Sequence, residues 1–113
     1  MRITIYPINI YLVFRIQEDV GLHSDLSELK QQIDHKLSTG TQHIVIAFTP
    51  NSYLYTRSIA VLISCLESIK DHNGSLAIME ANNDILDILS IIDFDKMIKI
   101  VKSESELGDT KVT

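Results

Sequence analysis

The sequence contains few of the residues from which small catalytic and cofactor sites are built. It has one cysteine, which excludes an internal disulfide, and four glycines, which leave little material for the glycine-rich loops that hold nucleotides. It contains no Gly-x-Gly-x-x-Gly pattern, no phosphate loop ending in Gly-Lys-Ser and no Gly-x-Ser-x-Gly turn. These absences argue against nucleotide-binding enzymes and hydrolases.

Positive charge is also scarce. Ten Lys and Arg residues stand against fifteen Asp and Glu residues, which gives a formal net charge of −5 at pH 7. Binding to nucleic acids depends on cations that neutralise the phosphates, so we do not expect nucleic acid as a partner.

Long apolar runs are missing as well. The longest early run, residues 3–14, covers about 12 positions against the ~20 that a membrane-spanning helix needs, and Pro7 and Asn9 interrupt it. The run lacks the small-residue cleavage site of a secretory signal. We therefore expect no membrane span and a cytoplasmic location, in which the single Cys65 stays reduced.

The histidines do not form a recognisable metal-binding pattern. They lie in separate segments of the chain, at His23, His35, His43 and His72, and none of them pairs with another at the spacing of two ligands on one helix. Cys65 falls in an apolar helical pattern, where a thiol packs as a small apolar side chain. We expect no metal, no cofactor and no enzymatic activity.

The residues that are present describe one globular α/β domain. The chain has 113 residues, of which 45% are hydrophobic and 22% charged, as in an ordinary packed domain. Period-two alternation and short β-branched runs predict five strands, at residues 2–6, 10–17, 44–48, 76–79 and 97–101. Apolar stripes at helical spacing predict three helices, which contain residues 26–37, 59–69 and 85–89.

The connections between these elements predict how the sheet is arranged. Pro7 belongs at a turn or a sheet edge, so the first two strands form an antiparallel pair. The later strands alternate with helices, which requires parallel pairing through right-handed crossovers. The unbroken apolar run at residues 44–48 is typical of a strand covered on both faces. We therefore expect a mixed, mostly parallel, five-stranded sheet with helices on both faces in residues 1–102, and a partly flexible tail in residues 103–113.

One segment, residues 51–58, contains aromatic side chains that a turn does not require. Two tyrosines and a leucine, residues 53–55, lie in a strand-to-helix loop, at the edge of an α/β sheet that usually carries function. Thr56 lies where the second helix begins, and the free amides there would stabilise a phosphate. Two interpretations stay open: a functional site, or a structural one in which Thr56 or Ser58 caps the helix and the tyrosines shield the strand end.

The order of elements and several local sequences resemble the STAS domains, the type typified by bacterial anti-sigma factor antagonists. The resemblance covers nearly the whole chain and rests on the strand at residues 43–48, the helix start at 58–62, the strand entry at 73–76, and residues 85–89 followed by 92–95. It implies a surface at the start of the second helix that docks on a protein partner. In the antagonists, that partner is an anti-sigma factor with serine kinase activity.

The family's loop commonly reads Asp-Ser-Ser-Gly, and its first serine accepts phosphate from the partner kinase. The aligned residues here are Tyr55, Thr56, Arg57 and Ser58, so Thr56 keeps a hydroxyl at the acceptor position, while a tyrosine replaces the carboxylate and a serine the glycine. The family's Gly-Glu-Leu-Asp before the first helix is Val-Gly-Leu-His here, at residues 20–23. The resemblance thus implies Thr56 as the phosphoacceptor, with Ser58 as the second candidate.

The function implied is that of a non-enzymatic regulator. The candidate contacts with the partner are Ser52, Tyr53, Leu54, Tyr55 and Arg57. An alternative is an adaptor that works without phosphorylation in a transporter or signalling complex. A third interpretation is a small-molecule receptor that uses the two tyrosines as a platform for a lipid or nucleotide. The sequence leaves self-association into a homodimer open.

Overall fold

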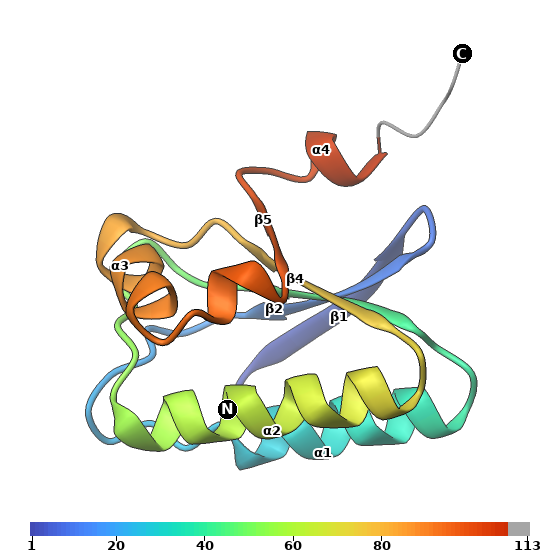
Figure 1. The fold of residues 1–113 in the computed structure, drawn as a ribbon, viewed down its shortest axis with the longest axis horizontal. Helices are drawn as coiled ribbons and strands as arrows, with labels where there is room; N and C mark the ends of the chain where they lie inside the picture. Colours follow the sequence, from blue (N-terminus) through green and yellow to red (C-terminus); the bar gives the residue numbers. More distant parts are fainter. Residues whose placement is uncertain (109–113) are drawn as a thin grey trace.

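Five strands form one sheet in the order β1-β2-β3-β4-β5. The computed structural model describes residues 1–108, and Figure 1 shows their arrangement. The elements are β1 (Ile3–Ile8), β2 (Tyr11–Ile16), α1 (Ser27–Ser38), β3 (His43–Ala47), α2 (Thr56–Asp71), β4 (Ser75–Met79), α3 (Asn83–Ile91), a 3-10 turn (Phe94–Lys96), β5 (Lys99–Val101) and α4 (Ser105–Gly108).

The sheet is mixed in the way that the sequence predicts. β1 and β2 are antiparallel, and β2, β3, β4 and β5 pair in parallel. Pro7 lies inside β1, opposite Leu12, and is tolerated there because β1 is an edge strand of the sheet. The hairpin turns at Asn9, whose φ of 57° falls in the left-handed region that asparagine adopts more readily than most residues. The predicted fold class is confirmed.

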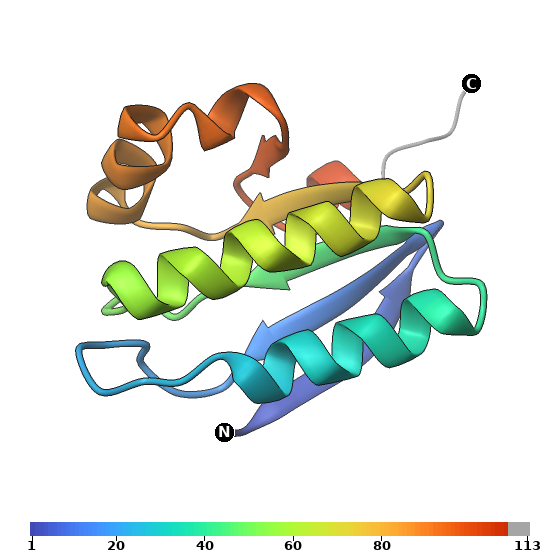
Figure 2. The same cartoon turned by 60° about the horizontal axis from the view of Figure 1, so that its bottom comes forward.

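The first face of the sheet is covered by α1 and α2, which run side by side in front of the sheet in Figure 2. The apolar stripes of both helices are buried there, with Leu29 and Ile33 from α1 and Leu62 and Ile69 from α2. Cys65 lies in the same core and is fully buried. Burial raises the pKa of its thiol to about 12, which keeps it protonated and unreactive, as the sequence predicts.

The second face is covered by α4, on the side opposite α1 and α2 (Figure 1). The sheet presents small and medium apolar side chains there, all buried: Val13, Val45, Ala47, Ala77, Met79 and Val101. Leu107 of α4 packs on them and is fully buried. The predicted cover on both faces is confirmed. Residues 103–108, which the sequence assigns to the tail, are packed on the sheet, and residues 109–113 of that tail lie outside the described residues.

A polar network borders this second apolar face. The Arg15 guanidinium donates to both carboxylate oxygens of Glu80, at 2.8 and 3.2 Å, and to Glu104 at 2.9 Å. It also donates to the Tyr6 hydroxyl at 3.0 Å, and that hydroxyl donates to Glu104. Hydrogen bonds from Tyr6 and Arg15 lower the pKa of Glu104, so its carboxylate stays charged. The network connects β1, β2, the end of β4 and the segment before α4.

The attachment of α4 is weak compared with that of the large helices. Full burial of one leucine contributes about 1.5–3 kcal/mol, and a partly exposed ion pair contributes about 1 kcal/mol at most. In α4 and the residue before it, Leu107 supplies the buried leucine and Glu104 supplies the ion pair. The first face, in contrast, buries a whole stripe from each of its helices.

The turn between α2 and β4 depends on Gly74. A Cβ atom at this position would lie 2.1 Å from the carbonyl oxygen of Gln42 and 3.1 Å from a methyl group of Ile69. We predict that Gly74→Ala lowers the free energy of unfolding by about 3 kcal/mol, because the backbone has to shift. A Cβ at Gly21 would meet no described atom within 4 Å, so Gly21→Ala should change stability by less than about 0.5 kcal/mol. Urea unfolding of both variants measures this, and equal losses would contradict the close packing at Gly74.

Candidate functional site

The loop between β3 and α2, residues 48–55, is fixed by hydrogen bonds to the segment that follows β2. The Ser52 hydroxyl accepts from the amide of Val20 at 2.9 Å and shares a 2.6 Å hydrogen bond with the Thr49 hydroxyl. The amide of Tyr53 donates to the carbonyl of Val20 at 2.8 Å. These bonds hold the loop against a second loop and set the direction of the side chains that follow.

Asn82 fixes the same loop from the other side. Its side-chain amide donates to the carbonyls of Pro50, at 2.9 Å, and Ser52, at 2.7 Å. Its side-chain oxygen accepts from the amide of Ile85 at 2.9 Å and so caps α3. The sequence gives no sign of the two loop bonds, because they join segments about 30 positions apart.

The pinned loop turns two of the predicted contact residues inward. Ser52 and Leu54 are buried, so their side chains support the loop and do not form part of its surface. The two tyrosines point the other way. Tyr53 is 36% exposed and Tyr55 is 40% exposed, and their rings meet edge to face with centroids 4.9 Å apart. The exposed aromatic feature of this loop is therefore the pair of Tyr53 and Tyr55.

The two candidate phosphoacceptors differ in accessibility. Thr56 is the first residue of α2 and is exposed. It is not the cap: the capping position is Tyr55, and no side-chain hydrogen bond closes this helix end, so the interpretation in which Thr56 or Ser58 caps α2 is wrong. Ser58 is fully buried and continues the inward stripe of Leu62. Its Oγ atom has no hydrogen-bond partner among the described residues.

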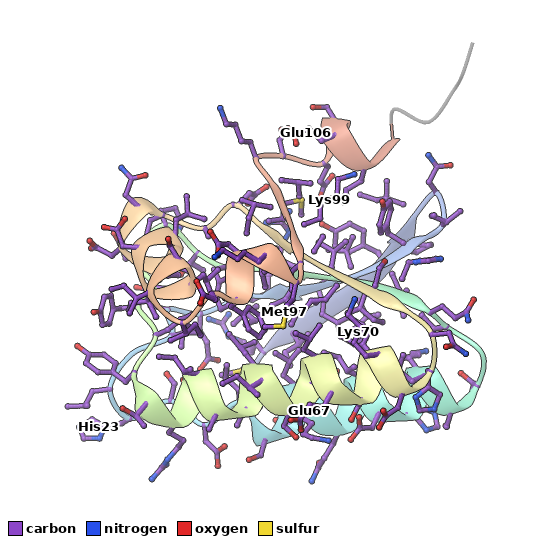
Figure 3. The ribbon with its side chains drawn as sticks, viewed as in Figure 1. His23, Glu67, Lys70, Met97, Lys99 and Glu106 are labelled. Carbon is purple, nitrogen blue, oxygen red and sulfur yellow. The ribbon has the colours of Figure 1, made fainter. Side chains whose placement is uncertain are left out.

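A shallow cleft of about 310 Å³ opens at this end of α2. It is lined by Leu22, His23, Tyr55, Thr56 and Arg57. Leu22 is 63% exposed, and His23 projects near the first turn of α2 in Figure 3. The loop that carries Leu22 and His23 is the one that follows β2, so two loops from neighbouring parallel strands meet here.

The charge at this helix end favours an anion. The first turn of α2 contains no acidic residue, and Arg57 is exposed within it. The field of Arg57 reaches Asp25, whose pKa is lowered chiefly by hydrogen bonds from Ser27 and further by that arginine. The unpaired amides of the helix add partial positive charge. A phosphate on Thr56 would therefore sit in a favourable field.

Within residues 1–108, no three His, Cys, Asp or Glu side chains come together as a metal site. None of the helices in that range is long and apolar enough to cross a bilayer.

Comparison with known proteins identifies the family of this chain. A family model described as "STAS domain" matches residues 3–107. No curated protein matches the chain.

Several solved structures share the fold. A Thermotoga maritima structure described as a "putative anti-sigma factor antagonist" is 18% identical and covers 92% of this chain and 89% of that one, with a TM-score of 0.80. The antagonist SpoIIAA in its unphosphorylated form is 9% identical, covers 99% and 100%, and has a TM-score of 0.78. RsbS of Moorella thermoacetica, as a variant, is 16% identical, covers 97% and 94%, and has a TM-score of 0.75. At these identities, the likeness shows the fold.

Asn82 is the residue whose removal should disturb the loop most clearly. We predict that Asn82→Ala lowers the free energy of unfolding by about 2 kcal/mol, because the variant loses a helix cap and two bonds to loop carbonyls. It should also change the near-ultraviolet circular dichroism of the tyrosine pair. Asn83→Ala, at the exposed first residue of α3, is the matched control and should cost less than about 0.5 kcal/mol. Equal losses, with unchanged tyrosine signals, would contradict the pinning role.

Proposed function

We propose that this chain, which belongs to the STAS domain family, is a non-enzymatic regulator that docks on an anti-sigma factor with serine kinase activity. The docking surface is the exposed part of the segment at the start of α2, formed by Tyr53, Tyr55, Thr56 and Arg57. The observation that carries the proposal is that Thr56, which the resemblance aligns with the family's acceptor, is exposed beside an exposed tyrosine pair. The partner kinase uses ATP, so we place the complex in the cytoplasm.

The chemistry of the surface supports a protein partner. Exposed tyrosines offer a large apolar area with a polar end, which is why they are enriched at protein interfaces. Ile63 is 40% exposed and stands two helical turns after Thr56, on the same side of α2. Together with Leu22 in the adjoining loop, it extends the apolar surface along the helix.

Phosphorylation of Thr56 would switch this surface. A phosphate adds about −1.5 to −2 units of charge, which the helix amides and Arg57 stabilise in the free protein. In the complex, the same group would introduce charge and volume into an apolar contact, so the partner is released. SpoIIAA has been solved in a phosphorylated and an unphosphorylated form, and both share this fold.

A second candidate function keeps the docking surface without the switch. Tyr55 stands where the family commonly has a carboxylate, immediately before the acceptor. A kinase that requires this carboxylate for recognition would not phosphorylate Thr56. The chain would then be a STAS adaptor, in a transporter or signalling complex, whose binding does not respond to ATP.

The hydroxyls of α2 distinguish these functions. We predict that incubation with the cognate anti-sigma kinase and ATP adds one phosphate to the wild type and to Ser58→Ala, and none to Thr56→Ala. Intact-mass spectrometry measures this. Thr56→Ala should change stability by less than about 0.5 kcal/mol, because no cap bond is lost. Ser58→Ala should be neutral or slightly stabilising, because it removes a buried hydroxyl without a partner.

Binding measurements complete the test. Tyr55→Ala should weaken the complex with the unphosphorylated chain by about tenfold or more, as for a central aromatic contact. Phosphate on Thr56→Ala would refute the acceptor assignment. A complex that forms equally well before and after treatment with kinase and ATP would favour the adaptor.

A further inference from the structure

The second face of the sheet holds apolar surface that one short element covers. The strands contribute the buried apolar side chains that were named above for this second face. Among them, Val45 and Ala77 lie opposite each other in β3 and β4, the two central parallel strands. Figure 3 shows Lys99 and Glu106 on this side of the sheet and Glu67 of α2 on the other. The cover on this side is α4, which has only four residues.

Two side chains make the contacts of this cover. Leu107 inserts into the apolar face and is fully buried. Glu104, three positions earlier, binds the Arg15 guanidinium and the Tyr6 hydroxyl. The side-chain amide of Asn9 donates a further hydrogen bond, of 3.3 Å, to the carbonyl of Leu107. The recognition pattern is thus one carboxylate followed, after three positions, by one aliphatic side chain.

The receiving site is preorganised on the sheet. Arg15 is fixed by two hydrogen bonds to Glu80, so its guanidinium is oriented by a group outside α4. Glu80 lies at the end of β4 with a φ of 60°, a backbone conformation that is uncommon for this residue type. Arg15 therefore stands at the edge of an apolar surface with a charge complementary to an incoming carboxylate.

We propose that the second face of the sheet is a docking surface for a helical turn of a partner protein in which a carboxylate precedes an aliphatic side chain by three positions, and that α4 occupies it in cis as a displaceable strap. A partner helix that presents the same pair takes the place of Leu107 and Glu104. This surface lies on the side of the sheet opposite α2, so the inference does not depend on the function proposed above.

The size of α4 makes displacement feasible. A single helical turn has almost no stability of its own, so its packing on the sheet is what holds it. The Glu104 side chain is 45% exposed, which weakens its ion pair with Arg15. Segments with one buried side chain and exposed backbone open locally well before the domain unfolds. A longer partner helix would bring further contacts that α4 cannot make.

A thiol placed under the strap measures its opening in the full chain. Ala77→Cys introduces one reporter on the second face, and the native Cys65 on the first face is the control in the same molecule. We expect the new thiol to react with a maleimide about tenfold faster than Cys65 or more, because local opening requires less free energy than global unfolding. Adding Leu107→Ala should raise the rate at position 77 by a further factor of about ten, with the Cys65 rate changed less. Equal rates at both thiols in every variant would overturn the strap.

A peptide tests the docking surface itself. The probe is a capped peptide with the sequence of residues 102–108, added at millimolar concentration to the full chain that carries Ala77→Cys and Leu107→Ala. The peptide should slow labelling at position 77 by about twofold or more, and a peptide with Gln in place of Glu104 should slow it less. Adding Arg15→Met to the chain should abolish the difference between the two peptides.

No slowing with either peptide, or equal slowing by both on the chain with Arg15 intact, would overturn the proposed recognition. Labelling that slows as the concentration of the chain itself rises would also overturn it, because a second copy would then be the occupant.

Discussion

The hydrogen bonds that pin residues 48–55 are the constraint on which the candidate site depends. Ser52 is bound through its hydroxyl to the loop after β2 and through its carbonyl to Asn82 at the start of α3. With the backbone fixed at this point, the alternation of an extended chain places Leu54 inside and a tyrosine outside on either side of it. The exposed aromatic pair is a consequence of buried polar contacts.

Helical periodicity then separates the two hydroxyls at the start of α2. Thr56 and Ser58 lie two positions apart, which turns them by about 200° relative to each other. The serine falls on the stripe that packs against the sheet, and the threonine falls on the exposed side. The same helix end that leaves its amides without a side-chain cap leaves them available to stabilise an anion. Position on the helix therefore determines which of the two hydroxyl residues is accessible to a partner protein.

Local patterns were sufficient for the sheet and its mixed pairing, because alternation and apolar stripes report which side of an element is buried. They failed where burial comes from distant segments. Ser52 is buried by contacts with residues about 30 positions away on both sides, and no local pattern reveals them. Residues 103–108 are rich in serine and glutamate, and their packing depends on Leu107 and on a charge pair with Arg15, 89 positions earlier.

The central claim is that the surface around the tyrosine pair and Thr56 meets the partner protein. Hydrogen–deuterium exchange of the chain, alone and bound to an anti-sigma factor kinase, tests this most directly. The account predicts that protection on binding concentrates in residues 53–63 and in the loop at residues 20–23. Protection that leaves these segments unchanged and appears elsewhere in the chain would contradict it.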